Sequence, residues 1–198
     1  MKYVTAVNRA LDEMLAGDAR SLVCGQLVKW GTAGITEGLH EKYPDQVITY
    51  PVSEALMNAS AMGLALAGTR CVMIHERMDF VAVSMDALIN HIPIWPKKCG
   101  VKLPLVIIGI VGKGHGQGPQ HSKNFSSWFA NFEGWTVFEP GTAEEAYRDM
   151  KKATSMDVPV FFALHRELFN TENESAPLRL SVTRLCGASK RHELEHYD

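Results

Sequence analysis

Residues 48–63 read ITYPVSEALMNASAMG, and this stretch combines the end of a strand, a turn and the start of a helix. The residues before Pro51 favour a strand, and the proline then enforces an extended turn. Ser53 suits a helix cap, and residues 55–69 carry no charge. A helix that is apolar on every side is expected to be buried. The stretch therefore predicts one strand-turn-helix unit of an α/β fold, with Glu54 as a lone acid where the helix begins.

The same alternation of strand and helix recurs along the chain. Strand patterns occupy residues 21–25, 46–50, 70–76, 103–112, 135–140 and 158–165. Helical patterns occupy residues 4–17, 34–44, 53–68, 78–92, 122–134 and 142–156. This order predicts an α/β fold with a mostly parallel six-stranded sheet and helices on both faces.

The alternating pattern also predicts the domain organisation. Residues 1–170 are expected to form one domain. Residues 171–198 are more polar and include LRLSVTRL, which alternates like an edge strand, so we expect a C-terminal tail or docking arm there.

Composition narrows the class of protein. Of the 198 residues, 46% are hydrophobic and 21% are charged, with a net charge of −2. This balance argues against a nucleic-acid-binding protein, and the apolar runs are too short for a membrane span. The four cysteines are widely spaced and form no CxxC pair, which argues against a metal site. We expect free thiols and a cytoplasmic protein without a signal peptide.

Glu54 has two interpretations. An acid in the first turn of a helix commonly complements the helix dipole and does nothing more. The helix, however, follows a strand, so it begins at the carboxyl edge of the sheet, where α/β folds bind ligands. An acid buried there could share a proton with a ligand nitrogen. From this segment alone both interpretations stay open.

Two other segments also follow strands. Residues 111–122 read VGKGHGQGPQHS and match neither GxGxxG nor a phosphate-binding GK[ST] loop. They form either a flexible surface loop or a loop that presents His115 and His121 for proton transfer near neutral pH. Residues 75–80 read HERMDF, in which Glu76 and Phe80 are either rim and core residues or part of a ligand platform.

Taken in order, these segments resemble the N-terminal half of the beta subunits of 2-oxo acid dehydrogenases. That half is the pyrimidine-binding domain of the transketolase-like superfamily, which uses thiamine diphosphate. The segments YPVSE and QHSKNFSSW carry the most specific part of the match. The resemblance implies that Glu54 contacts a ring nitrogen of the aminopyrimidine, that Phe80 packs on this ring and that His121 reaches the substrate. Glu54 and His121 would be catalytic, and Glu54, Phe80 and Glu76 would bind the cofactor, which acts as an electron sink.

The sequence also departs from the family pattern. Leu27, in GQLV, stands where the family usually has an acid, and Glu76 stands where an apolar residue is usual. The glycine-rich loop is more polar than usual. These departures suggest an altered substrate chemistry, with Leu27, His115 and Gln120 as candidates on the substrate side.

The resemblance further implies a partner chain. The family's diphosphate-binding pattern, GDG followed by an asparagine, does not occur here, and the C-terminal domain of the beta subunits is expected to be absent. An alpha-type subunit would hold the diphosphate and Mg²⁺ in an α2β2 heterotetramer, with residues 79–92 as a candidate interface. We expect no nucleic-acid or membrane partner.

The implied reaction cleaves next to the carbonyl of a 2-oxo acid or an α-hydroxy ketone. The enzyme would then decarboxylate the substrate or transfer the acyl or two-carbon unit. One alternative is the beta component of a 2-oxo acid dehydrogenase. An alternative of another class is a non-catalytic structural or regulatory subunit.

Overall fold

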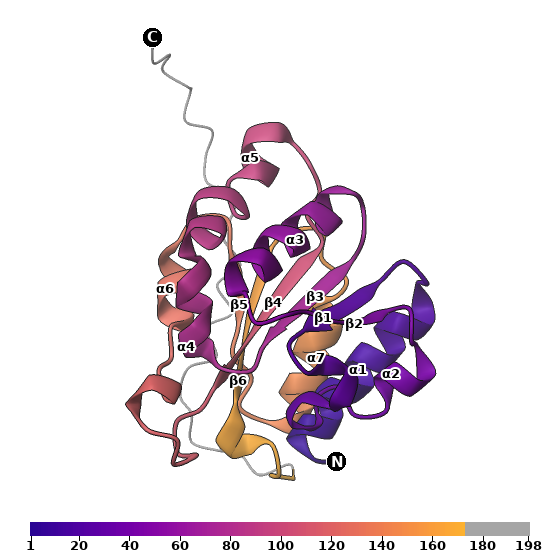
Figure 1. Cartoon of the computed structure of the whole chain (residues 1–198), viewed down its shortest axis with the longest axis vertical. Coiled ribbons are helices and arrows are strands. Elements are labelled where there is room, and N and C mark those ends of the chain that lie inside the picture. Colours follow the sequence, from indigo (N-terminus) through magenta and orange to yellow (C-terminus); the bar gives the residue numbers. More distant parts are fainter. Residues whose placement is uncertain (173–198) are drawn as a thin grey trace.

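The structure is a computed structural model that describes residues 1–172, so the predicted tail and its LRLSVTRL segment lie outside the described residues. Its centre is a six-stranded sheet in the order β2-β1-β3-β4-β6-β5, in which every pair is parallel (Figure 1). The strands are β1 Leu22–Gly25, β2 Val47–Thr49, β3 Cys71–His75, β4 Leu105–Val111, β5 Thr136–Phe138 and β6 Val160–His165. The predicted α/β class and parallel sheet are confirmed.

Helices cover both faces of this sheet, as Figure 1 shows. The helices are α1 Tyr3–Gly17, α2 Leu39–Lys42, α3 Glu54–Leu66, α4 Met78–Val81, α5 Trp95–Cys99, α6 Ser126–Asn131 and α7 Ala143–Ala153. The central strand β4 is buried at every position, which explains its unbroken run of apolar residues. No helix within residues 1–172 is long and apolar enough to cross a bilayer.

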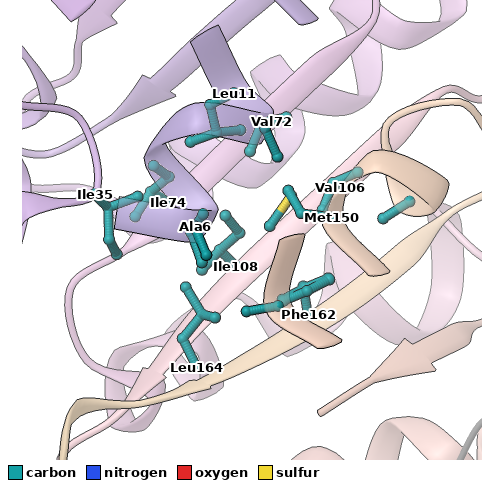
Figure 2. Close-up of a cluster of buried hydrophobic side chains, with 14 of the residues drawn as sticks. Ala6, Leu11, Ile35, Val72, Ile74, Val106, Ile108, Met150, Phe162 and Leu164 are labelled. Atoms are coloured by element: carbon teal, nitrogen blue, oxygen red, sulfur yellow. The ribbon is translucent and has the colours of Figure 1, made fainter. Parts of the chain in front are cut away.

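One face of the sheet packs against α1 and α7. Figure 2 shows this core, in which Ala6 and Leu11 from α1 and Met150 from α7 meet Ile108 and Phe162 of the sheet. Alternate strand residues point to opposite faces, so Val72 and Ile74 belong to this core, while Cys71 and Met73 face α3. Each fully buried large apolar side chain contributes roughly 1.5–3 kcal/mol.

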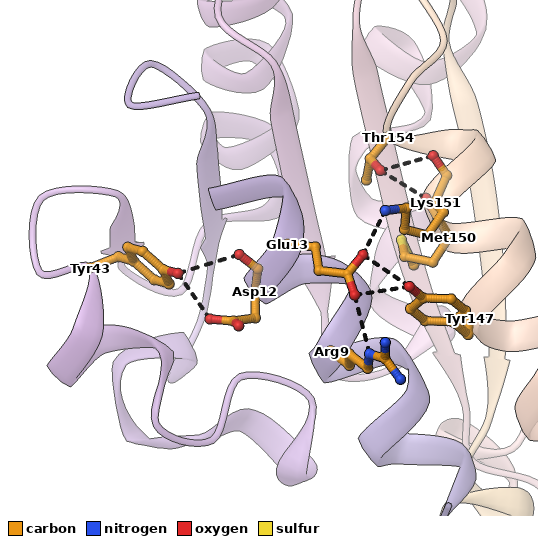
Figure 3. Close-up of polar contacts among 8 residues, drawn as sticks. All are labelled: Arg9, Asp12, Glu13, Tyr43, Tyr147, Met150, Lys151 and Thr154. Carbon is orange, nitrogen blue, oxygen red and sulfur yellow. Dashed lines mark hydrogen bonds and ion pairs between the residues drawn. The ribbon is translucent and has the colours of Figure 1, made fainter. Parts of the chain in front are cut away.

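Hydrogen bonds and ion pairs at the surface link α1 to α7. Glu13 accepts hydrogen bonds from Lys151 at 2.5 Å, from the Tyr147 hydroxyl at 2.8 Å and from Arg9 at 3.1 Å (Figure 3). The hydrogen bond from Lys151, followed by that from Tyr147, lowers the pKa of Glu13 to about 2. The carboxylate is therefore ionised across the neutral pH range.

Two helix predictions need correction, and a third is confirmed with a change of helix type. Residues 34–44 were expected to be helical throughout, but only α2 is, because Gly34 and Gly38 adopt positive φ. The expected helix at 122–134 begins only at Ser126, because the residues before it are held in a loop by side-chain hydrogen bonds. The expected long helix at 78–92 is present, but its type changes from α4 to a 3-10 turn at Ala82–Ser84 and a π-helical turn at Ala87–His91.

The prediction that α3 is buried on every side is also wrong for this chain. Its inner face, with Met57, Ala61 and Ala65, is fully buried against the sheet. Its outer face leaves Leu56 47% and Leu66 40% exposed. An apolar composition predicted burial correctly on one face, and the other face is available to a partner.

Candidate functional site

The candidate site lies at the carboxyl edge of the sheet. All strands are parallel, so the segments that follow them meet at one edge. The chain order reverses at β1, because β2 lies on one side of it and β3 on the other. Such a switch point opens a crevice in which α/β sheets bind ligands. The segments that follow the strands carry Gln26, Glu54, Glu76, Phe80 and His121 to this edge.

Glu54 is the buried acid of this edge. It begins α3, its exposed fraction is 9%, and its Oε1 accepts a hydrogen bond from Gln26 Nε2 at 3.1 Å. Ser53 occupies the capping position, but its side chain forms no capping hydrogen bond, contrary to expectation. Within residues 1–172 no basic side chain forms an ion pair with Glu54. The carboxyl group is thus held by one neutral amide and keeps the capacity to bind a ligand nitrogen.

Phe80 and His121 lie together. Their ring centroids are 5.4 Å apart and the ring planes meet at 83°, so one ring presents its edge to the other. Phe80 is 37% exposed, which is unlike a core aromatic residue. His121 Nδ1 is buried and has no hydrogen-bond partner among the described residues. The pair therefore offers an apolar ring and an imidazole at the same place.

The glycine-rich loop after β4 returns His121 to the sheet. A Cβ at Gly112 would lie 2.0 Å from the carbonyl oxygen of His121, so only glycine permits this close approach. Arg77, which directly precedes α4, holds this loop. Its Nε donates to Gln117 Oε1 at 2.8 Å, and its Nη1 donates to the carbonyl oxygen of Glu76 at 2.6 Å. His121 is consequently set by backbone packing and by one arginine.

The other substrate-side candidates lie on exposed backbone. His115 and Gln120 belong to the exposed part of the loop. Leu27 is 50% exposed and adopts a left-handed conformation, with φ 56° and ψ 8°. Such a conformation costs a non-glycine residue of order 1–3 kcal/mol and is common at functional sites. The roles of these three residues remain predictions.

Glu76 has charged neighbours of its own. It is half-buried, and burial raises its pKa, although Arg77, Arg166 and Thr32 act in the opposite direction. Arg166 follows β6, and burial together with the charge of Arg77 lowers its pKa. Glu76 thus belongs to a cluster with two arginines, and its predicted contact with the cofactor stays a prediction.

Sequence reasoning missed several polar residues of this region. Gln26, the partner of Glu54, directly precedes Leu27. A buried polar chain, formed by His75, Asn58 and Ser84, runs beneath α3. The sequence offered one signal for two of them. Asn58 and Ser84 are polar residues in otherwise apolar segments, and they follow the candidate residues Glu54 and Phe80 by four positions.

A second missed cluster surrounds Glu139 at the end of β5. Its Oε1 accepts hydrogen bonds from His165 Nε2 at 2.6 Å and Asn124 Nδ2 at 2.7 Å, and its Oε2 accepts one from Ser126 Oγ at 2.7 Å. Burial would raise the pKa of Glu139, but the hydrogen bonds from His165, Ser126 and Asn124 outweigh it and lower that pKa. This cluster anchors Asn124 and Ser126, which lie three and five residues after His121. Within the described part of the chain, no three potential metal ligands of the His, Cys, Asp or Glu type gather closely.

A parallel sheet with helices on both faces defines an α/β domain, and a buried acid at its carboxyl edge is typical of a ligand-binding member of this class. Residues 1–171 match the model of the transketolase pyrimidine-binding domain, and the chain belongs to this family. This match confirms the resemblance.

Similar proteins carry related names. The chain is 33% identical over 170 residues to the mitochondrial pyruvate dehydrogenase E1 subunit beta of Dictyostelium discoideum, covering 83% of this chain and 48% of that protein. It is 28% identical over 183 residues to the beta subunit of acetoin:2,6-dichlorophenolindophenol oxidoreductase of Cupriavidus necator, covering 85% and 54%. The chain thus spans about half the length of these relatives.

A solved structure has the same fold. A split-gene transketolase, described as an inactive beta4 tetramer, superposes with a TM-score of 0.69 at 21% identity, covering 84% of this chain and 51% of that one. At this identity the likeness concerns the fold.

Proposed function

We propose that this chain is the pyrimidine-binding half of a thiamine-diphosphate-dependent enzyme that a second chain completes. The observation that carries the proposal is Glu54, an acid that is 91% buried at the start of α3 and has no cationic partner within residues 1–172. Burying a carboxyl group that has one neutral amide and no cation as side-chain partner is costly, so a ligand that pairs with it explains its position. Membership of the pyrimidine-binding family supports this ligand.

The residues of the site fit an aminopyrimidine ring. Glu54 would hold a proton between its carboxyl group and a ring nitrogen, and Gln26 would keep the carboxyl group in place. Phe80, which is partly exposed, would pack on the ring. When bound, thiamine diphosphate supplies an electron sink for bond cleavage next to a carbonyl.

His121 would act on the substrate side of the same ring. Its edge-on contact with Phe80 supports a position beside the pyrimidine. An imidazole there can give a proton to the substrate oxygen or accept one from it. Gly112 and Arg77, which hold the loop, would keep this imidazole in reach.

The proposed substrate is a 2-oxo acid or an α-hydroxy ketone, which the enzyme decarboxylates or splits for transfer of a two-carbon or acyl unit. The names of the relatives, a pyruvate dehydrogenase and an acetoin oxidoreductase, support this class. The alternative is oxidative transfer, as in a 2-oxo acid dehydrogenase. An assay with and without an artificial electron acceptor separates the two outcomes.

The proposed partner is an alpha-type subunit that binds the diphosphate and Mg²⁺ in an α2β2 heterotetramer. Exposed apolar residues beside the site support a large interface, since Trp30 is 67%, Val52 81% and Val83 64% exposed. Both curated relatives are named as beta subunits, which also supports a partner.

Native mass spectrometry of the chain purified from its own cells, with Mg²⁺ and thiamine diphosphate present, tests this proposal. We expect a heteromer that carries the cofactor, and the sequence of the second chain then identifies the partner. A homo-oligomer without cofactor would support the alternative of a non-catalytic structural or regulatory subunit.

A further inference from the structure

A chain of three buried polar side chains crosses the apolar layer beneath α3. His75 at the end of β3 is 2% exposed, Asn58 in α3 is 0% exposed and Ser84 is 3% exposed. His75 Nε2 lies 3.0 Å from Asn58 Oδ1, and Asn58 Nδ2 donates to Ser84 Oγ at 2.5 Å. Ser84 Oγ in turn donates to the carbonyl oxygen of Val81 at 3.0 Å. The buried polar chain therefore links β3, α3 and the segment after α4.

The hydrogen bonds of the buried polar chain depend on how the Asn58 amide is oriented. Asn58 donates to Ser84 through its amide nitrogen, so its amide oxygen faces His75 and accepts a hydrogen bond from Nε2. Burial lowers the pKa of His75 to about 4, so the ring is neutral at neutral pH, and a proton on Nε2 matches this orientation of the Asn58 amide. In the flipped orientation the Asn58 nitrogen would donate to His75 Nε2, and the ring proton would then lie on Nδ1.

Two members of the chain lie one turn beyond the proposed cofactor-binding residues. Asn58 is four residues after Glu54 on α3, and Ser84 is four residues after Phe80. On α3, residues four apart lie on the same face, and Ser84 belongs to the 3-10 turn that directly follows α4. The hydrogen bond between Asn58 and Ser84 therefore links the element that carries the acid to the element that carries the aromatic ring.

Apolar packing alone would not fix this spacing. The inner face of α3 contacts the sheet through Met57 and two alanines, Ala61 and Ala65. Small and flexible apolar side chains tolerate sliding, whereas hydrogen bonds depend on distance and direction. The buried polar chain supplies the directional contacts of this layer.

We propose that His75, Asn58 and Ser84 are positioning residues that set the spacing between Glu54 and Phe80, and thus place the aminopyrimidine between the acid and the aromatic ring. This inference rests on the proposed function. None of the three touches the reacting atoms. They act through the two elements that they join.

The test compares substitutions at His75 in the complex with its partner chain and thiamine diphosphate. His75→Leu leaves the Asn58 oxygen without a donor, whereas His75→Gln keeps an N–H donor. The double variant His75→Leu/Asn58→Leu removes both partners and leaves no unsatisfied group between them. Thr154→Val, which removes a buried hydroxyl where α7 ends, is the matched control.

Three readouts separate positioning from stability. They are the Tm of the chain, the dissociation constant of thiamine diphosphate and the rate at which the acidic thiazolium proton of the bound cofactor exchanges for deuterium. We expect His75→Leu to slow the exchange about 10- to 100-fold, as misplacement of reacting groups does, and His75→Gln to recover most of the rate. The double variant should regain Tm but keep slow exchange, and Thr154→Val should change only Tm.

Two outcomes would overturn the inference. One is a double variant that recovers both Tm and the exchange rate, because the buried polar chain would then be only structural. The other is normal exchange in His75→Leu, or, if that variant does not fold, in the double variant. Glu54→Gln distinguishes this failure from failure of the proposed function. Normal exchange in Glu54→Gln refutes the function itself. Slow exchange in Glu54→Gln together with normal exchange in His75→Leu refutes only the positioning role.

Discussion

Acidification should destabilise the fold through His75. Burial lowers the pKa of this residue from 6.5 to about 4. The unfolded chain binds a proton at His75 below about pH 6.5, whereas the folded chain binds it only near pH 4, so stability falls as the pH falls through this window. A shift of about 2.5 units at 1.36 kcal/mol per unit corresponds to a loss of about 3 kcal/mol in the free energy of unfolding. Below about pH 4 this contribution stays constant, because both states are protonated.

Urea unfolding at a series of pH values measures this loss. Other histidines also titrate, so the comparison is with His75→Gln, which keeps a hydrogen-bond donor but cannot be protonated. Between about pH 6.5 and about pH 4 the wild-type chain should lose about 3 kcal/mol more than the variant. Equal losses in the two proteins would refute the assignment of a buried neutral imidazole. An NMR titration of the His75 ring nitrogens checks the pKa directly.

Three further substitutions test the loop that carries His121. Gly112→Ala should lower the free energy of unfolding in urea by about 1–3 kcal/mol, because the new Cβ would meet the His121 carbonyl oxygen. Gly63→Ala, which has open space around it, is the control and should not destabilise the chain. Equal effects of the two substitutions would contradict this packing. Glu139→Gln should release the segment 122–126, seen as faster amide hydrogen exchange there, and unchanged exchange would mean that the carboxylate does not anchor it. His121→Ala should slow turnover about a hundredfold and leave cofactor affinity nearly unchanged, and a pure binding defect would contradict its substrate-side role.

The sheet could be predicted from sequence because its strands have strong local signals. The continuous apolar run of β4 is typical of a parallel strand that is covered on both faces, and it is buried at every position. The helices were harder. The outer face of α3 is apolar yet exposed, because composition does not distinguish a face that packs on the sheet from one available to a partner. The local pattern predicted a helix at 78–92 but did not predict its 3-10 and π-helical turns.

The site was predictable where a residue follows a strand directly. Glu54, Phe80 and His121 could be placed at the carboxyl edge from the order of strands and helices, and the structure brings Phe80 and His121 together. Their supporting partners could not be predicted. The contacts of Gln26 with Glu54 and of His165 with Glu139 join residues 28 and 26 positions apart, and they depend on how neighbouring strands align.

Exchange of the thiazolium proton in Glu54→Gln tests the central claim most directly, because it needs the assembled complex and the cofactor but no identified substrate. Glutamine has nearly the same size as glutamate, but its amide cannot share a proton with the ring nitrogen of the cofactor. The account predicts an unchanged fold, retained cofactor binding and exchange slowed about a hundredfold or more. Exchange at the wild-type rate with the cofactor bound would contradict the assignment of Glu54 as the acid of the pyrimidine site.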